Sequence, residues 1–549
     1  MTQDTAAAGG APGIADILAG TPLQEGLLAL HRTGEGSDPY HIQCVFRMDG
    51  PLDADLLRRS VVAAVDRHPN LRAAFVDRGV PHPVQVIPVS APLDWEVVDA
   101  VPGAADPAVA AAEFRRPFDL SAPSPMRFRL LRRSATRHEL IFTAHHIIID
   151  GWSAPLFFRE VMEIYEADGD ASHLPAPAPY RAYIAWLAER SRDRSLARWR
   201  ERLGEGTTPC HLSAAAASGD AASGDSTDRT GSTDRTPGPG HATVEAALGT
   251  AATRVLTDWC RAHRVTVSTA TLFAWAVVLG VLTDRDDVVT GTVVSGRPPE
   301  VPGIGSMVGM FINTVPVRVR LRPGDDAASQ VEALHRDVTE MREHEYVGLA
   351  DIQRQAGQRD LFDTLVVYQN TPGGDDGVRT TSQGVRVTPL RTADSTHYPF
   401  TLVPAVVDGR LTVRGEYRED DAGRTGLPVR PERIVRAVTA LLETLPLSDG
   451  TALARLGTGF GAGDGDGDGG DGDGGAGGGR TGATSPDATS PDATSPDAGT
   501  VTPVHGRLAA LVAADPDAPA VCDGSTVLTR AGLWDRAGRV AARLRALGV

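Results

Sequence analysis

His145-His146-Ile147-Ile148-Ile149-Asp150-Gly151 is the stretch that decides the fold of this chain. It follows residues 139–144, which are mostly apolar and rich in β-formers and therefore predict a buried strand. Residues 126–130 alternate in the manner of a half-buried strand, so the two segments together predict a hairpin. Ser153 is a candidate N-cap for a helix that runs to about residue 168. The pattern places two histidines, an aspartate and a glycine at a strand-to-helix turn, where a rigid scaffold usually displays reactive groups.

The chemistry that this turn favours is acyl transfer. A neutral imidazole can take a proton from an attacking amine or hydroxyl, or donate a hydrogen bond to a developing oxyanion. Asp150 lies too close in sequence to be assumed a relay partner; once buried it needs a cation, and we expect it to hold the turn in shape. We expect Gly151 to give the turn a backbone conformation closed to other residues. The alternative interpretation is a buried, hydrogen-bonded histidine beside a capping aspartate.

The seven residues match HHxxxDG, the signature of the condensation domains of nonribosomal peptide synthetases, and the chain resembles this family over roughly residues 13–450. The other motifs of the family occur in the right order. They are Thr21–Leu28, Arg67–Arg72, Ser295–Pro298, Met307–Arg318 and Leu361–Asn370. The resemblance implies an α/β fold of α+β two-layer sandwiches, in which two chloramphenicol-acetyltransferase-like lobes form a V-shaped pseudo-dimer.

The resemblance also implies roles for individual residues. His146, the second histidine, is expected to carry the chemistry, as a base toward the amine or as a donor to the oxyanion. His145 is expected to be structural. Arg297 is the cation that we expect to pair with Asp150, and the alternative is a surface arginine before a proline turn.

Three further residues belong to the expected active-site motif. Asn313 is expected on a loop that crosses between the lobes, with a strand cap as an equally good interpretation. Gly151 and Trp152 are expected to shape the turn. The form Asp150-Gly151-Trp152-Ser153 resembles that of condensation domains that join two L-configured residues.

The family resemblance further implies the substrates and partners. The histidine turn would face a tunnel between the lobes, where a donor acyl or peptidyl thioester meets an aminoacyl thioester, each on the 4′-phosphopantetheine arm of a carrier protein. The partners are then an upstream donor carrier and a downstream acceptor carrier. The donor is expected from a separate upstream synthetase, because only a short tail precedes the first motif. No bound cofactor is expected, and no metal, because the calcium-like stretch 464–475 has Gly475 where such a loop needs Glu.

Three rival functions remain open at this point. An epimerase shares HHxxxDG but normally follows a carrier domain. A coenzyme-A-dependent acyltransferase of the same fold would need no adenylation domain after it, whereas residues 501–549 resemble the start of such a domain. A non-catalytic recruitment domain is the rival from another class, and such domains tend to lose the second histidine. His146 is present.

Composition favours a cytoplasmic enzyme. The chain has 549 residues, is 41% hydrophobic and carries a formal net charge of −16, which argues against a general nucleic-acid or anionic-membrane binder. Four widely spaced cysteines fit a reducing compartment, and the N-terminus lacks the features of a signal peptide. The uncharged stretch 265–283 is long enough to span a membrane, but its Thr and Ser residues favour a buried core helix at 267–282.

Other patterns predict the remaining elements. Asp53 is a candidate cap for a helix that ends before Pro69, and one long helix is expected to run through Tyr183 to Leu203. Strands are expected at 362–369, 520–523 and 528–529, and a helix is expected over 530–547. The chain is predicted to divide into a disordered tail (1–12), an N-terminal lobe (13–175), a C-terminal lobe (176–456, with a low-complexity loop at 213–240), a flexible linker (457–500) and the start of an adenylation domain (501–549).

Overall fold

The computed structural model describes two lobes and a short hairpin near the C-terminus. The predicted tail 1–12, the linker 457–500 and the helix expected over 530–547 lie outside the described residues, as does the low-complexity loop from residue 217 onward. The described residues are 13–33, 39–99, 106–204, 206–216, 241–369, 378–394, 396–419, 424–453, 519–523 and 526–529.

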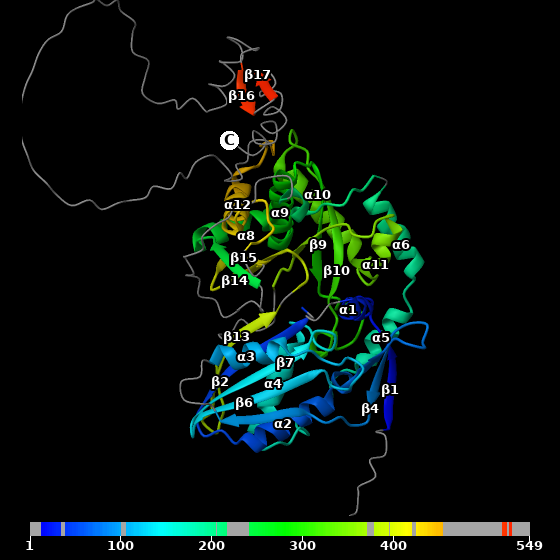
Figure 1. The fold of residues 1–549 in the computed structure, drawn as a ribbon, viewed down its shortest axis with the longest axis vertical. Helices are drawn as coiled ribbons and strands as arrows, with labels where there is room; N and C mark the ends of the chain where they lie inside the picture. The colour runs from blue at the N-terminus through cyan, green and yellow to red at the C-terminus, as the bar shows by residue number, and fades with distance from the viewer. Residues whose placement is uncertain are drawn as a thin grey trace, which may run out of the picture.

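The first lobe is built on a six-stranded sheet, and the predicted hairpin supplies two of its inner strands (Figure 1). β6 (Met126–Ser134) and β7 (Arg137–His145) pair antiparallel, with Phe128 opposite Phe142, so the hairpin that carries the histidines is confirmed. β2 (His41–Asp49) pairs with β7 and brings His41 opposite His145. The sheet has the order β12-β13-β2-β7-β6-β5.

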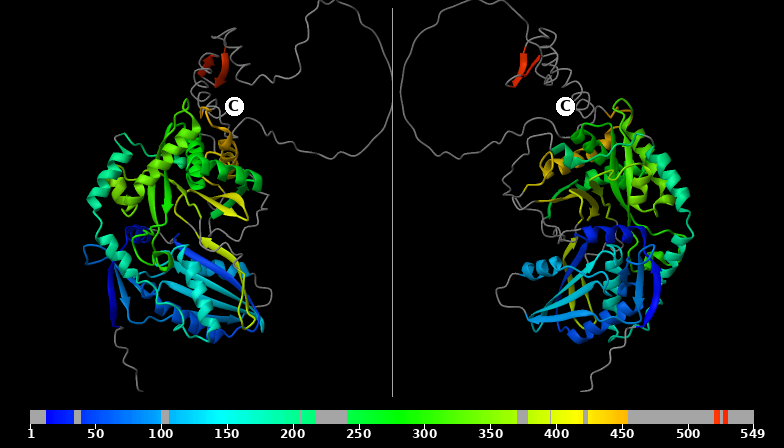
Figure 2. Two further views of the ribbon diagram at one scale, coloured as in Figure 1. Left: turned by 180° about the vertical axis from the view of Figure 1, so that it is seen from behind. Right: turned by 45° about the vertical axis from the view of Figure 1, so that its right-hand side comes forward.

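Two strands of this sheet come from far along the chain. β12 (Arg379–Thr380) and β13 (Arg386–Asp394) extend the sheet beyond β2, and Figure 2 shows the yellow strand among the blue and cyan ones. The sequence places this segment in the second lobe, but Val387 belongs to the apolar core of the first. Apolar and polar residues alternate in a strand in the same way whichever lobe it packs against. The sequence pattern of β13 therefore does not reveal which sheet it joins.

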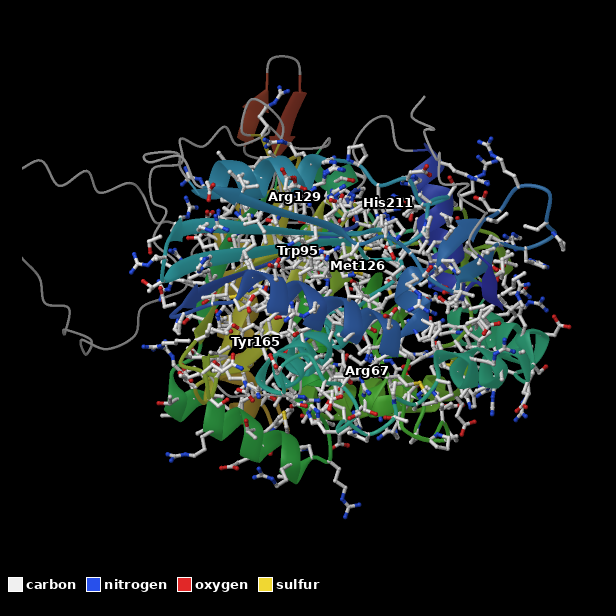
Figure 3. All side chains as sticks on the ribbon, turned by 90° about the horizontal axis from the view of Figure 1, so that it is seen from below. Arg67, Trp95, Met126, Arg129, Tyr165 and His211 are labelled. Carbon is white, nitrogen blue, oxygen red and sulfur yellow. The ribbon has the colours of Figure 1, made fainter. Side chains whose placement is uncertain are left out.

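Helices α2 (Ala54–Arg67) and α4 (Ser153–Glu166) contact each other in the first lobe. Figure 3 labels one residue of each helix, Arg67 and Tyr165. Asp53 caps α2 as expected, because its carboxylate accepts hydrogen bonds from two backbone N–H groups of the first turn. Arg67 of α2 donates to Glu160 of α4 at 2.9 Å, and the hydroxyl of Tyr165 accepts a hydrogen bond from the N–H of Asp53 at 3.0 Å. The other elements of this lobe are β1 (Ile14–Ala19), α1 (Pro22–Thr33), η1 (Pro69–Arg72), β3 (Ala74–Val76), β4 (Val84–Pro88), β5 (Asp94–Asp99) and α3 (Asp106–Arg115).

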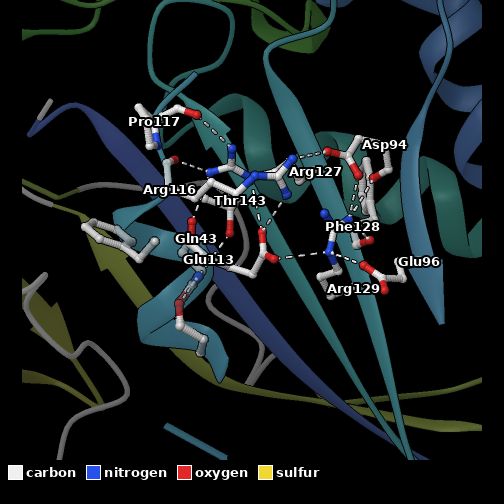
Figure 4. Close-up of polar contacts among 12 residues, drawn as sticks. Gln43, Asp94, Glu96, Glu113, Arg116, Pro117, Arg127, Phe128, Arg129 and Thr143 are labelled. Carbon is white, nitrogen blue, oxygen red and sulfur yellow. Dashed lines mark hydrogen bonds and ion pairs between the residues drawn. The ribbon is translucent and has the colours of Figure 1, made fainter. Parts of the chain in front are cut away.

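Helix α3 packs against the first sheet through a polar network (Figure 4). Glu113 of α3 lies 3.2 Å from guanidinium nitrogens of both Arg127 and Arg129 on β6. Gln43 of β2 donates to the carbonyl of Ala110 at 2.8 Å. Burial lowers the pKa of Arg127 to about 10, with the charge of Arg116 as a second cause. The ion pairs between α3 and the sheet therefore lie beside an apolar cluster of only four buried residues.

The second lobe has its own six-stranded sheet, in the order β10-β9-β11-β14-β15-β8. The predicted core helix is confirmed as α9, in which Trp275 stacks on Phe400 with ring centroids 5.3 Å apart and donates to Thr290. β11 is shorter than the strand predicted at 362–369. The elements are α7 (Leu212–Ala216), β8 (His241–Ala247), α8 (Thr250–Ala262), α9 (Val267–Thr283), β9 (Asp287–Val294), β10 (Asn313–Arg320), α10 (Ala327–Met341), η3 (Arg342–His344), α11 (Leu349–Gln355), β11 (Thr364–Val366), β14 (Phe400–Val407), β15 (Arg410–Arg418), α12 (Pro431–Thr444) and η4 (Leu445–Leu447).

Residues 295–312, called the crossing loop below, connect β9 to β10 and include η2 (Ile304–Ser306). Although both strands belong to the second lobe, apolar side chains of this loop pack in the core of the first. Helix α5 (Tyr180–Ala188) packs in the same core: the rings of Tyr183 and Phe311 lie 4.9 Å apart. The crossing loop therefore joins the two lobes.

The single long helix expected to reach Leu203 is instead two helices, α5 and α6 (Arg192–Leu203). Ser191 caps the second helix by accepting a hydrogen bond from the N–H of Arg194. A serine that can cap a new helix start favours a break in an otherwise continuous apolar pattern.

Two strands were expected near the C-terminus, and both are present. β16 (Pro519–Asp523) pairs antiparallel with β17 (Thr526–Thr529). Their assignment to an adenylation domain stays a prediction. In the described part of the chain, no single helix is long and apolar enough to cross a membrane; α8 and α9 reach that length only together, and they meet at an angle of 103°.

A substitution at Gly296 tests the backbone path of the crossing loop. Its φ is +59°, and a Cβ at this position would overlap the carbonyl oxygen of Phe311. Gly296→Ala should therefore lower the free energy of unfolding by roughly 1–3 kcal/mol or more, measured by urea denaturation. Gly305→Ala in the same loop is the matched control, because a Cβ there meets no atom within 4 Å. Equal stability of the two variants would contradict the described path of the loop.

Candidate active site

The histidine turn is held by backbone hydrogen bonds on one side and by apolar side chains on the other. The N–H of His145 donates to the carbonyl of Pro125 at 2.9 Å, and the N–H of His146 donates to that of Tyr40 at 2.8 Å. Ile147, Ile148 and Ile149 are all at most 2% exposed and belong to the core of the first lobe. Burial of such side chains stabilises by about 1.5–3 kcal/mol each, so the turn has little freedom to move.

His146 lies at the wall of a large cavity and has contacts at both ring nitrogens. Nδ1 lies 3.0 Å from the carbonyl oxygen of Ile149, and Nε2 lies 2.8 Å from Oδ1 of Asp394. The side chain is 8% exposed. Asp394 is the last residue of β13 and lies opposite Ile42 of β2. Sequence reasoning missed Asp394, because it belongs to none of the motifs and reaches the site only through the register of β13.

His145 points away from this cavity and is fully buried. Its Nδ1 accepts a hydrogen bond from the N–H of Ile147 at 2.9 Å, and its ring meets those of His41 and Phe118 edge-on. His145 is not among the residues that line the cavity. Its contacts stabilise the turn.

The predicted ion pair between Asp150 and Arg297 is present. Oδ1 of Asp150 lies 3.4 Å from Nη2 of Arg297, and the two side chains are 0% and 5% exposed. Oδ2 accepts a hydrogen bond from the N–H of Phe311 at 3.0 Å. Arg297 in turn donates to the carbonyls of Ile304 and Met307 at 2.6 and 3.0 Å. The pair therefore fastens the histidine turn to the crossing loop.

Ser153 does not cap helix α4 as expected; it is the first residue of the helix. Its N–H donates to Oδ1 of Asp150 at 2.8 Å, so the aspartate satisfies this end of the helix. The hydroxyl of Ser153 accepts from Arg297 at 2.8 Å and donates to the carbonyl of Gly309 at 2.8 Å. A serine at this position thus extends the link between the turn and the crossing loop.

The expectation for Gly151 was wrong: its φ is not in the left-handed region, and a Cβ there would meet no atom within 4 Å. Gly151 lines the cavity, so a side chain at this position would enter it. Trp152 lines the same cavity and donates from Nε1 to the carbonyl of Gly305 at 3.1 Å.

Asn313 is the first residue of β10. Its Nδ2 donates to the carbonyls of Glu345 and Val347 at 2.7 and 2.9 Å, which corresponds to the strand-cap interpretation.

The cavity has a volume of about 2160 Å³ and is walled by both lobes. The first lobe contributes α1, β2, α4 and β13, and the second contributes ends of β9 and β10 together with α11 and β11. The cavity is thus larger than ordinary ligand pockets, which measure about 300–1,000 Å³. His146 is the member of the HHxxxDG pair that reaches it.

A second histidine of the cavity wall, His397, was not found from the sequence. Its Nδ1 contacts the hydroxyl of Tyr40, which also lines the cavity. Burial lowers the pKa of His397 to about 4, and the nearby charge of Arg418 adds to this effect. The ring is therefore neutral at physiological pH.

Comparison with known proteins agrees with this geometry. The family described as "Condensation domain" matches residues 14–422, about three quarters of the chain. The chain belongs to the condensation domain family. Condensation domains of nonribosomal peptide synthetases are in general amide-forming acyltransferases that work with carrier-protein domains of the same assemblies.

Relatives of this condensation domain are found in large synthetases. Chondramide synthase of Chondromyces crocatus is 36% identical over 384 residues, which cover 68% of this chain and 9% of the synthase. A polypeptide of the linear gramicidin synthase of Brevibacillus parabrevis is 31% identical over 413 residues, which cover 71% of this chain and 5% of that polypeptide. The chain thus spans less than a tenth of the length of either relative.

Solved structures support the fold. The X-domain from teicoplanin biosynthesis has a TM-score of 0.64 at 20% identity, covering 79% of this chain and 95% of its own. The first condensation domain of the calcium-dependent antibiotic synthetase, solved with a substrate analogue, has a TM-score of 0.60 at 22% identity, covering 80% and 99%. These likenesses confirm the two-lobed, chloramphenicol-acetyltransferase-like fold of the condensation domain.

Removal of Asp150 tests the ion pair. Asp150→Ala would leave the guanidinium of Arg297 buried without its carboxylate, so the free energy of unfolding should fall by about 3–5 kcal/mol. Denaturant unfolding followed by tryptophan fluorescence measures this change. Arg261→Ala is the control: it breaks a pair with Asp258 in which both side chains are more than half exposed, and it should cost less than about 1 kcal/mol.

His397 gives a pH-dependent prediction. Its pKa is about 4 in the folded chain, against about 6.5 for an unfolded histidine. Between these values the unfolded state binds more protons, so His397 contributes stability above pH 6.5 that is lost as the pH falls toward 4. His397→Gln should make the loss of unfolding free energy over this range shallower than in the wild type. Parallel curves for the two proteins would show that His397 does not resist protonation.

Proposed function

We propose that this condensation domain forms an amide bond between a donor acyl or peptidyl thioester and the amine of an acceptor aminoacyl thioester. Each substrate would be held on the 4′-phosphopantetheine arm of a carrier protein, one upstream and one downstream. The observation that carries this proposal is the place of His146, on the wall of a cavity to which both lobes contribute. Two tethered reactants could approach the same imidazole there.

The reaction needs no group that is bound permanently to the chain. The nitrogen of the acceptor attacks the donor carbonyl, a C–N bond forms, and the C–S bond breaks as the sulfur leaves with its electron pair. The proton that the nitrogen loses ends on the departing sulfur. Orientation of two reactants in one cavity can contribute roughly 7–11 kcal/mol to lowering the barrier, so much of the rate would come from the shape of the site.

The buried supports of the turn fit this role. His146 is held by the backbone of Tyr40 and Ile149, and the turn is fixed to the crossing loop by Asp150 and Arg297. A reactive group works best when its surroundings hold it within a fraction of an ångström of the productive position. We further propose an L-to-L type of condensation, from the form Asp150-Gly151-Trp152-Ser153, in which Trp152 faces the cavity.

His146→Ala should lower the rate of amide formation by about 10²–10⁴-fold, because it removes the group that handles the proton or the oxyanion. The assay mixes donor-loaded and acceptor-loaded carrier proteins with the chain and follows the acceptor-bound product by mass spectrometry. His173→Ala, at an exposed position outside the cavity, is the control.

The same assay separates the rival functions. A mass increase of the acceptor equal to the donor acyl group supports condensation. Inversion of one tethered residue without a mass change indicates an epimerase, and transfer from coenzyme A without a carrier indicates a free acyltransferase. Unchanged turnover in His146→Ala would show that another residue carries the reaction.

A further inference from the structure

The contacts of His146 restrict where its hydrogens can be. A carbonyl oxygen only accepts hydrogen bonds, so Nδ1, which lies 3.0 Å from the carbonyl of Ile149, must carry a hydrogen. An ionised carboxylate also only accepts, and Oδ1 of Asp394 lies 2.8 Å from Nε2. Both contacts are hydrogen bonds at once only if a proton is shared between Nε2 and Asp394.

The surroundings decide which partner holds this proton. Asp394 lines the cavity and its side chain is 21% exposed, so solvation favours its ionised form. In water an aspartic acid loses its proton at a pKa of about 3.9, whereas an imidazolium does so at about 6.5. An adjacent carboxylate favours the cation further. The proton is therefore expected on the imidazole.

Three other ionisable groups of this turn or next to it, Asp150, Tyr40 and His145, have contacts of their own. Asp150 pairs with Arg297, and Tyr40 contacts His397 through its hydroxyl. His145 uses Nδ1 to accept a hydrogen bond from the backbone. By contrast, Asp394 contacts the ring of His146 directly.

We propose that Asp394 holds His146 as an imidazolium in the resting site and is the carboxylate that receives the amino group of the acceptor. This inference rests on the proposed function and deepens it, because it assigns separate roles to the two residues. An imidazolium has no lone pair with which to accept a proton, and both of its N–H groups already donate, one to Ile149 and one to Asp394. His146 therefore stabilises the oxyanion through its positive charge. The nitrogen loses its proton to Asp394, the C–N bond forms, the C–S bond breaks, and the proton passes from Asp394 to the departing sulfur.

The substrate class follows from this arrangement. The nitrogen of an attacking amine becomes positively charged as the C–N bond forms, and it stays charged until it loses a proton. An adjacent carboxylate stabilises that charge. The position of Asp394 therefore fits an amine acceptor.

The test uses the full chain labelled with ¹⁵N at histidine. The ¹⁵N shifts of an imidazole distinguish the imidazolium from either neutral tautomer, and the signals of His146 are identified by their absence in His146→Gln. At about pH 8, well above the ordinary histidine pKa of about 6.5, the wild type should show His146 as an imidazolium. In Asp394→Asn, which keeps the shape of the side chain, the same ring should be neutral with its hydrogen on Nδ1.

Activity provides the second measurement. Asp394→Asn should lower amide formation at least 10²-fold, and Asp394→Glu should recover part of it. Asp258→Asn, which changes an exposed carboxylate outside the cavity, should leave the rate within twofold. A neutral His146 in the wild type at this pH, or an imidazolium that persists in Asp394→Asn, would overturn the inference. The spectra decide this even if no donor and acceptor pair reacts, so failure of the proposed function is distinguishable from failure of the inference.

Discussion

The buried ion pair between Asp150 and Arg297 is the interaction on which the site depends. The carboxylate belongs to the turn after β7 and the guanidinium to the crossing loop, so the pair joins a first-lobe strand to a segment between two second-lobe strands. A buried ion pair is most stable when its remaining lone pairs and protons are also hydrogen-bonded. Backbone groups of both segments bond both oxygens of Asp150 and one terminal nitrogen of Arg297, while Nε of Arg297 has no hydrogen-bond partner among the described residues. These bonds fix the position of the histidine turn relative to the cavity.

Apolar and charged residues of the turn have separate functions. Ile147, Ile148 and Ile149 fill the core and hold the backbone, while Asp150 fixes the direction in which the chain leaves. Between these anchors, His146 is the one residue of the turn's histidine pair that reaches the cavity. Because its neighbours are fixed, its ring can be held against Asp394 without any rearrangement of the first lobe. This is the condition under which a preorganised charge contributes most to stabilising a transition state.

Much of the fold and part of the site could be predicted from the sequence. Local pattern is enough for the hairpin, the cap at Asp53 and the helix α9, because each depends on neighbours within about ten residues. The ion pair of Asp150 with Arg297 was accessible only through the motifs of the family. The roles of Asp394 and His397 could not be predicted from the sequence. These residues reach the site because β13 pairs with β2, which lies more than three hundred residues earlier in the chain. The break before α6 and the conformation of Gly151 were misjudged, because capping and tertiary packing outweigh the local pattern.

The placement of β13 also limits how such a domain can be recombined. A hybrid that joins one parent's residues before α5 to another parent's residues after it would assemble its first sheet from two sources, with β2 of one chain against β13 of the other. The acidic partner of the histidine would then come from the second parent and the histidine from the first. A single crossover between the lobes therefore divides the first sheet between two parents, whereas a junction outside both lobes keeps the matched strands together.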